Sequence, residues 1–379
     1  MKFAFPEIKI GAKDWVFAVV LALLCVILWQ MPAIDSPIKQ TGKTVSAEVL
    51  STDNSSLMEM GIEHYGSQYL QVKILDGKLK NEVFDAANEL RGEMDLDKIF
   101  VPGDRITVVI AKDVVPGKSV LIAKDYDRFP WSVVLFAGFC LLLIAFGAWT
   151  GVKALFSFLF SCLVIFKMII PLTLKGYPAG WMIFGCTALL TAVIIFLVAG
   201  LNRKGSAAFI GSVAGILSAL LLSRLFSELL HINGATLHGS RALLYNIEAS
   251  LDLADVFTGA VILACSGAVM DLAMDIASAV EEVARHNSNL GFRELTASGI
   301  RVGRSVVGTM TTTLLLAYSG GYLTTLMMFS WQGTHPVDTL NNPVVAAEVV
   351  KTLIGSFSLI SVAPLTAVAA GWLFRCRKA

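Results

Sequence analysis

The sequence predicts a polytopic α-helical membrane protein of about eight transmembrane helices, with a small, mainly-β domain outside the membrane between the first and second helices. Three observations predict this class. Apolar residue types make up 55% of the chain and charged types 16%, below the share of about 25% that is typical of soluble domains. Long apolar runs recur along most of the chain, and residues 36–128 form one polar interruption. The long apolar runs make membrane lipids the expected surroundings of the chain. A net charge of +1 gives no indication that the protein binds nucleic acid.

Three parts follow from this pattern. Residues 1–35 hold an N-terminal segment and the first helix, residues 36–128 form the external domain, and residues 129–379 form a seven-helix transmembrane domain with a cytoplasmic linker at about 281–302. A span takes about 20 apolar residues. The runs that we expect to span are 15–31, 131–149, 152–173, 178–200, 206–230, 254–280, 303–327 and 347–373.

Basic residues orient these helices. If all eight spans are present, most of the loop arginines and lysines fall on one side, namely Lys2, Lys9, Lys13, Lys153, Arg203, Lys204, Arg285, Arg293, Arg301, Arg304, Arg375, Arg377 and Lys378. The opposite side holds little besides Lys175, Arg241 and Lys351. Because loops rich in Lys and Arg remain in the cytoplasm, both termini are predicted to be cytoplasmic and residues 36–128 to lie outside.

The external segment has the pattern of strands and turns. Short runs, most of them rich in β-branched residues, occur at 46–51, 68–75, 81–85, 104–111 and 119–123, and residues 86–96 are compatible with a short helix. Asp76-Gly77 and Pro102-Gly103-Asp104 are turn sequences. Five strands in about 90 residues predict a small barrel of the OB type. The segment lacks a basic aromatic face, so we interpret it as an interaction or gating module that binds no nucleic acid.

Two carboxylates inside a predicted span are the main candidates for function. Asp271 and Asp275 stand four residues apart, on one face of a helix. A charged carboxylate in a bilayer costs at least about 2.5–3.5 kcal/mol, so such residues are protonated, paired or hydrated. Asp275 is nearer the cytoplasmic end, where it is also explained as a helix-end residue reaching the headgroups. Asp271 is deeper and is the stronger candidate for a proton or ion relay.

The next predicted span offers partners for Asp271. Its hydroxyl residues are Thr311, Thr312 and Thr313, and Gly267, Gly303 and Gly308 are small enough to allow close helix approach or gating. The alternative is ordinary small-residue packing, with each hydroxyl bonded to its own helix backbone. If the threonines do face Asp271, protonation of that carboxyl would change their hydrogen bonds and tilt one helix against the other.

Other polar residues in apolar surroundings have simpler explanations. Arg224 and Glu228 form an i,i+4 pair near an outer helix end, where snorkelling explains both. Glu228 and His231 have an ExxH spacing, but no HExxH or HxxxH accompanies it, so we predict no metal site. The chain contains no P-loop and no GxSxG, and its two candidate carboxylates share one helix, unlike those of an intramembrane aspartyl protease. We therefore expect neither an enzyme nor a cofactor.

The chain resembles the YibE/F-like family of bacterial membrane proteins along nearly all of its length. The residues that carry the resemblance are 267–274 (GAVMDLAM), 276–278, Glu294-Leu295, Ser298-Gly299, and 308–318 (GTMTTTLLLAY) followed by Gly320. The resemblance implies a multi-pass protein of the bacterial cytoplasmic membrane, of transporter type, with no assigned substrate. The family often has a small polar residue at the position of Asp275, which favours Asp271 as the family's site.

A looser similarity connects the same stretch to the membrane core of SecD/SecF and RND transporters. Gly267, Asp271, Glu281-Glu282, Gly299 and the three threonines match that core in order and roughly in spacing. The acidic residue at the position of Asp271 belongs to a proton relay in that superfamily. The chain differs in lacking an Asn after Asp271, in its small external domain, and in having seven predicted spans after that domain rather than five.

Two functions remain open. The leading hypothesis is a proton- or ion-coupled exporter of an unknown small solute or ion, with an Asp-Thr relay. The alternative is a non-enzymatic membrane partner that assists assembly, insertion or export by another protein. In either case another membrane protein, or a second copy of this chain, is an expected partner.

Overall fold

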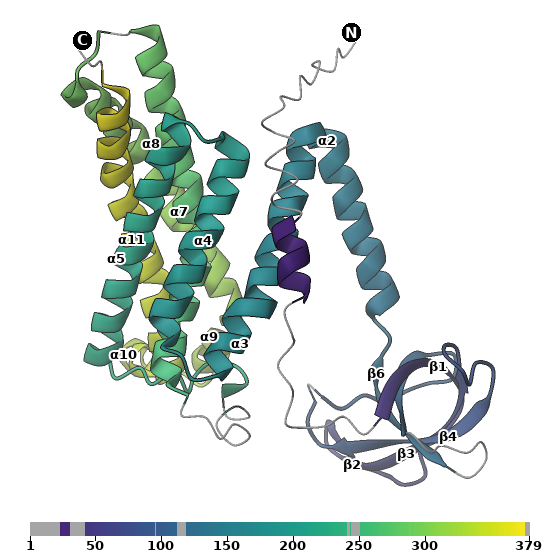
Figure 1. The fold of residues 1–379 in the computed structure, drawn as a ribbon. Coiled ribbons are helices and arrows are strands. Elements are labelled where there is room, and N and C mark those ends of the chain that lie inside the picture. The colour runs from purple at the N-terminus through teal and green to yellow at the C-terminus, as the bar shows by residue number, and fades with distance from the viewer. Residues whose placement is uncertain are drawn as a thin grey trace, which may run out of the picture. The chain divides into compact units, whose positions relative to one another are not determined.

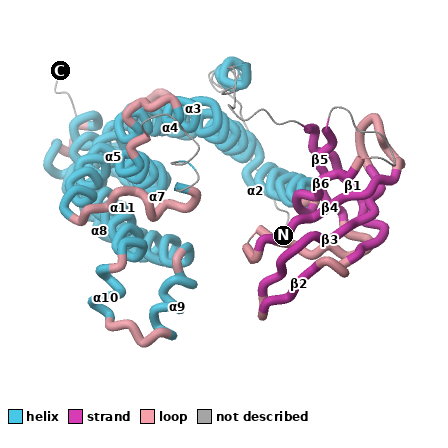
Figure 2. The backbone as a smooth tube through the Cα atoms, turned by 90° about the horizontal axis from the view of Figure 1, so that it is seen from below, coloured by secondary structure: helices cyan, strands magenta, loops and turns pink. Residues whose placement is uncertain are grey.

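The computed structural model describes residues 23–30, 42–94, 96–111, 119–240, 243, 251–287 and 289–375. Residue contacts divide the chain between Leu142 and Leu143 into a smaller unit that contains the strands and a larger helical unit that also takes in the described residues 23–30. Figure 1 shows both units, and Figure 2 separates the helices from the strands by colour. Each unit is described by itself.

The smaller unit is built on a five-stranded barrel. Its described strands are β1 (Gly42–Asp53), β2 (Leu57–Met60), β3 (Glu63–Ile74), β4 (Val83–Arg91), β5 (Arg105–Ala111) and β6 (Val120–Tyr126). β1 pairs with both β3 and β5, which closes the sheet in the order β1-β3-β4-β6-β5, and β2 extends β3 as a hairpin. The pairs are antiparallel except β4 with β6. The predicted small barrel of five strands is thus confirmed.

The short helix considered for residues 86–96 is wrong, because β4 continues to Arg91 as a strand. Its side chains alternate between exposed and buried along the strand, and Phe84, Ala86 and Leu90 point into the barrel. Pairing with β3 on one side and β6 on the other outweighs the helix propensity of Ala, Glu and Leu in this stretch.

A group of hydrogen-bonded polar residues lies inside the barrel. Gln68 on β3 is fully buried, and its amide exchanges two hydrogen bonds with the backbone of Phe100: Nε2 donates to the carbonyl at 2.8 Å, and Oε1 accepts from the N–H at 3.0 Å. Asn88 on β4 donates to the same Oε1 at 3.1 Å. These bonds satisfy the amide in an apolar interior and attach the segment before β5 to the barrel wall.

The helical unit contains the elements that carry the candidate site. Its described elements, with the start of α2 in the smaller unit, are α2 (Phe129–Val164), a π-helical turn (Ile165–Ile169), α3 (Ile170–Leu174), α4 (Ala179–Ala199), α5 (Arg203–Leu229), α7 (Leu253–His286), α8 (Phe292–Gly321), α9 (Leu323–Trp331), α10 (Pro336–Asn341) and α11 (Pro343–Phe374). Five described segments are long and apolar enough to cross a membrane: 129–174, α4, α5, α7 and α11. The protein is therefore a membrane-helix protein.

The predicted count of eight spans is not confirmed. The spans expected at 131–149 and 152–173 lie in one segment, which is interrupted at Ala148 by a non-helical backbone (φ 45°, ψ −121°). Of the span expected at 15–31, residues 23–30 are helical and the others lie outside the described residues. The span expected at 303–327 corresponds to α8, which begins at Phe292, carries charged residues in its first half and ends at Gly321.

The predicted linker at about 281–302 is largely helical. α7 continues to His286 and α8 starts at Phe292, so only residues 287–291 separate the two helices. Such a short connection makes the helices antiparallel neighbours. Val280 lies against Gly299 and Ile276 against Gly303, which fixes the register of α7 on α8.

Two pairs of glycines hold α11 in the bundle. On α5, a Cβ atom at Gly211 would collide with Thr366, and one at Gly215 would lie 2.9 Å from Cβ of Val362. On α8, Cβ atoms at Gly299 and Gly303 would lie 2.8 Å and 2.9 Å from the Cβ atoms of Ala367 and Ala363. Both helices thus use glycines four residues apart to accept neighbouring rows of α11, as in GxxxG packing.

Replacing Gly303 with leucine should separate α8 from α11. The added side chain has no room beside Ala363, and overpacking of this kind costs about 1–3 kcal/mol. We expect a lower midpoint of thermal unfolding for Gly303→Leu in detergent. The matched control is Gly185→Leu on α4, where no atom lies within 4 Å of the added Cβ. Equal stability of the two variants would contradict this packing.

Candidate functional site

The two predicted carboxylates lie on an open side of α7. Asp271 and Asp275 are both exposed, whereas Leu272, Ala273, Ile276 and Ala277 between and beside them are buried in the bundle core. Neither carboxylate has an ion pair or a side-chain hydrogen bond to another described residue. The structure therefore places them one turn apart on one face, as their spacing predicts, and leaves them without a partner in the described part of the chain.

The predicted threonines bond to their own helix. The hydroxyl of Thr312 donates to the Gly308 carbonyl at 3.1 Å and that of Thr313 to the Thr309 carbonyl at 3.0 Å. Thr311 donates to the carbonyls of Val307 at 3.0 Å and Gly308 at 3.1 Å. These bonds agree with the alternative in which each threonine hydroxyl bonds to the backbone of its own helix. Among the described residues, no hydrogen bond joins one of these threonines to Asp271. Each hydroxyl oxygen still has a lone pair for a further partner.

The three predicted glycines have different surroundings. Gly303 is buried against α11 and α7, as described above. Gly267 and Gly308 have no atom within 4 Å of an added Cβ, so in the described part of the chain they face open space rather than a neighbouring helix. Ile276 of α7 lies beside Gly303 of α8, and the two helices run in opposite directions. Five residues back along α7 and five residues forward along α8 cover the same distance, so Gly308 lies level with Asp271.

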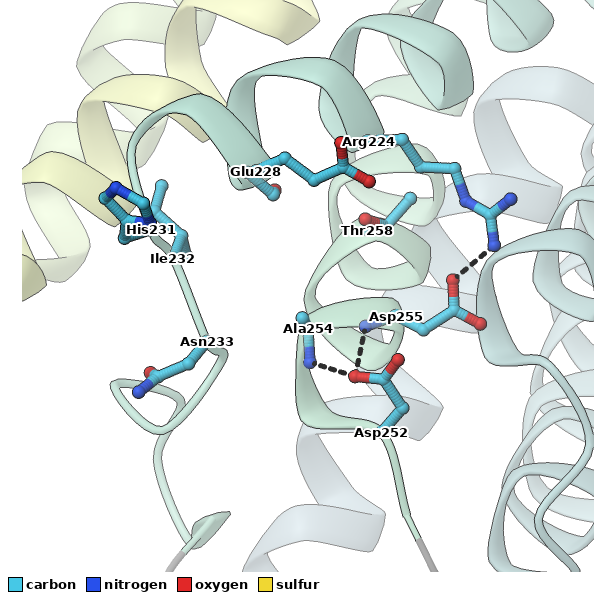
Figure 3. Close-up of a pocket in the computed structure, with 10 residues that line it drawn as sticks. Arg224, Glu228, His231, Ile232, Asn233, Asp252, Ala254, Asp255 and Thr258 are labelled. Carbon is cyan, nitrogen blue, oxygen red and sulfur yellow. Dashed lines mark hydrogen bonds and ion pairs between the residues drawn. The ribbon is translucent and has the colours of Figure 1, made fainter.

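A second cluster of polar residues lies at the end of α5 and the start of α7 (Figure 3). Arg224 donates through Nη2 to Oδ1 of Asp255 at 2.9 Å, and the Asp255 side chain is only 10% exposed. Oδ2 of Asp255 accepts from the backbone N–H of Gly180 at 2.9 Å. The Arg224 guanidinium also lies over the ring of Trp181, 5.5 Å from its centroid. One ion pair thus connects α4, α5 and α7.

Gly180 makes this arrangement possible. A Cβ atom at this position would lie 2.6 Å from Oδ1 of Asp255, so a larger residue would push the carboxylate away. One turn before Asp255 along α7, Asp252 caps the helix: its Oδ1 accepts from the N–H groups of Ala254 at 3.0 Å and Asp255 at 3.3 Å. Both carboxylates are therefore held in fixed positions.

These residues border a pocket of about 750 Å³, which we call the end pocket. It is lined by Arg224, Ser227, Glu228, His231, Ile232, Asn233, Asp252, Ala254, Asp255 and Thr258. Ser227 is 6% exposed, and its hydroxyl has no hydrogen-bond partner among the described residues. Glu228 is exposed, and its carboxylate has no partner in the described part of the chain. Figure 3 shows Glu228 and Thr258 on the side of the pocket that adjoins Arg224.

This cluster was not predicted from the sequence. The i,i+4 spacing suggested Glu228 as the neighbour of Arg224, whereas the partner of Arg224 is Asp255, 31 residues away on another helix. The available signal was the rarity of charge in apolar helices: Arg224 in the apolar part of α5 and Asp255 in the first turn of α7 are candidates to neutralise each other. In the described residues, no group of three His, Cys, Asp or Glu side chains is placed to hold a metal ion.

Replacing Arg224 with methionine tests the ion pair. The variant leaves the buried Asp255 carboxylate with the Gly180 N–H as its only bonded partner in the described residues, which should destabilise the fold by about 1–3 kcal/mol. We expect a lower midpoint of thermal unfolding. Arg285→Met is the control, because Arg285 forms an exposed pair with Glu282 at 3.9 Å, and such pairs contribute little. Equal midpoints for the two variants would show that the inner pair does not stabilise the bundle.

A family model described as YibE/F-like protein matches residues 135–376. No curated protein matches the chain, and no solved structure does.

Proposed function

The chain belongs to the YibE/F-like family, and we propose that it is an integral membrane transporter that exports a small solute or ion by coupling its movement to protonation of Asp271. On this proposal the chain is not an enzyme and needs no cofactor. It resides in the bacterial cytoplasmic membrane with both termini in the cytoplasm and the barrel outside.

The position of Asp271 carries this proposal. The residue lies 18 positions after the start of α7 and 15 before its end, inside a helix that is apolar enough to span a membrane. It has no counter-charge among the described residues. A permanently charged carboxylate at this depth is unfavourable, so a proton, an ion or water is the expected partner. A carboxyl that exchanges such partners is what a coupled transporter requires.

The surroundings of Asp271 support an exchange of partners. Gly308, level with Asp271 on α8, and Gly267, one turn before Asp271 on α7, both leave free space near this carboxyl. The hydroxyls of Thr311, Thr312 and Thr313 donate to their own helix, so their oxygens remain acceptors for a protonated Asp271. By the same register Asp275 lies level with Arg304 on α8.

Replacing Asp271 with asparagine should abolish coupling. Asparagine resembles the protonated carboxyl in shape but cannot release a proton, so the variant is fixed in one state of the cycle. We expect normal expression and loss of proton flux in proteoliposomes that hold a pH-sensitive dye. Asp275→Asn is the matched control and should be milder, and Thr312→Val should be intermediate. Wild-type flux in the Asp271→Asn protein would eliminate the relay.

Cysteine labelling tests the proposed orientation. Met60→Cys in the barrel and Asn289→Cys between α7 and α8 would be made in a cysteine-free chain and exposed to a membrane-impermeant maleimide. We expect label at position 60 in intact cells and at position 289 only after permeabilisation. Label at both positions from the same side would contradict a topology with eight spans.

The alternative function is that of a non-enzymatic partner of another membrane protein. The observation that favours it is the open face of Gly267, Asp271 and Gly308, which another helix could cover. Retention of function by Asp271→Asn, together with loss on Gly308→Leu, would favour this alternative over transport.

A further inference from the structure

The end pocket lies far from Asp271. Asp255 precedes Asp271 by 16 residues, which is about 24 Å along a helix. We propose that the end pocket is a binding site for a small organic cation that carries ammonium groups. This proposal does not depend on the proposed relay, since it concerns different residues near the start of α7, whereas Asp271 lies near the middle of that helix.

The size of the pocket fits an organic molecule. Its volume of about 750 Å³ falls within the range of about 300–1,000 Å³ that is usual for small-molecule sites. The pocket lies between the last turn of α5, the residues that follow it and the first turns of α7, as Figure 3 shows. The ion pair of Arg224 with Asp255 and the cap formed by Asp252 hold part of this wall in place.

The charges in the pocket favour a cation. Three carboxylates line it against one guanidinium, which leaves a formal surplus of two negative charges when His231 is neutral. Asp255 is already bonded to Arg224 and Gly180, and Asp252 to backbone N–H groups. Glu228 alone keeps its carboxylate free among these acids, so it is the residue available to a positively charged ligand.

An unsatisfied hydroxyl provides independent support. Ser227 lines the pocket and is 6% exposed, and its buried hydroxyl lacks a hydrogen-bond partner among the described residues. Buried polar groups are nearly always hydrogen-bonded, so a group that enters the pocket is the natural partner. Thr258, which is 2% exposed, adds a second hydroxyl on the α7 side of the pocket.

These groups suit an ammonium better than a metal ion. An ammonium donates several hydrogen bonds in different directions, and one carboxylate with one or two hydroxyls is enough to hold it. A divalent transition metal needs converging His, Cys or carboxylate ligands, and the described residues hold no group of three such side chains. The negative surplus also disfavours an anion.

Titration calorimetry on the purified full chain in nanodiscs of zwitterionic lipid tests the proposal. The probe is 1,4-diaminobutane dihydrochloride, with 1,4-butanediol as a neutral analogue and magnesium chloride as a metal. We expect saturable binding of the diamine alone. Glu228→Gln should weaken it about tenfold or more, because a charge-assisted bond is lost, and Ser227→Ala should weaken it severalfold.

Two controls make the result specific. Asp338→Asn removes another exposed carboxylate, on α10 at the same end of the bundle, and should leave the affinity unchanged (Figure 1). Asp271→Asn should also bind the diamine normally, so failure of the relay and failure of this site are distinguishable. If Glu228→Gln does not elute as a monodisperse protein, Thr258→Val takes its place and should weaken binding severalfold.

Several outcomes would overturn the proposal. They are no saturable diamine binding, equal binding of the diol, preferential binding of magnesium, or equal effects of Glu228→Gln and Asp338→Asn. The last result would show attraction to surface charge in general rather than recognition in the end pocket.

Discussion

Close packing of α11 against glycine surfaces is the constraint on which the helical unit depends. In a bilayer, helices gain little from burying apolar side chains, since lipid is equally apolar, and association relies on close contact. Gly211 and Gly215 of α5 accept one side of α11, and Gly299 and Gly303 of α8 accept the other. Once α11 occupies this position, the core faces of α5, α7 and α8 are covered.

The same packing decides which part of α7 stays open. Val269, Leu272, Ala273 and Ile276 are buried in the shared core, so a helical turn of 3.6 residues directs Asp271 to the opposite side. The core is thus apolar, and the polar group lies where exchange with a proton, an ion or a second protein is possible. This separation explains how a carboxylate can be kept in a spanning helix without disturbing the bundle.

Near the start of α7, in contrast to Asp271, a buried carboxylate is paired with a positive charge. Near the start of α7, the carboxylate of Asp255 is neutralised within the chain by Arg224 and by a backbone N–H that Gly180 brings close. This pair connects α4, α5 and α7 where the glycine contacts of α11 do not reach. Beside it, Ser227 and Glu228 remain without partners among the described residues. Fixed and unpaired polar groups side by side are the combination that a ligand site requires.

The sequence by itself determined the membrane class and the approximate positions of the five strands that form the barrel, because apolar run length and alternation are local properties. It also placed Asp271 and Asp275 on one face. Only the tertiary structure decided that residues 86–91 pair as a strand, that Arg224 meets Asp255 rather than Glu228, and that Gly303 packs while Gly308 stays open. Each of these depends on which distant segment becomes the neighbour. The local sequence determines the shape and polarity of one face of a helix or strand. Which distant segment packs against that face depends on the packing of the whole unit.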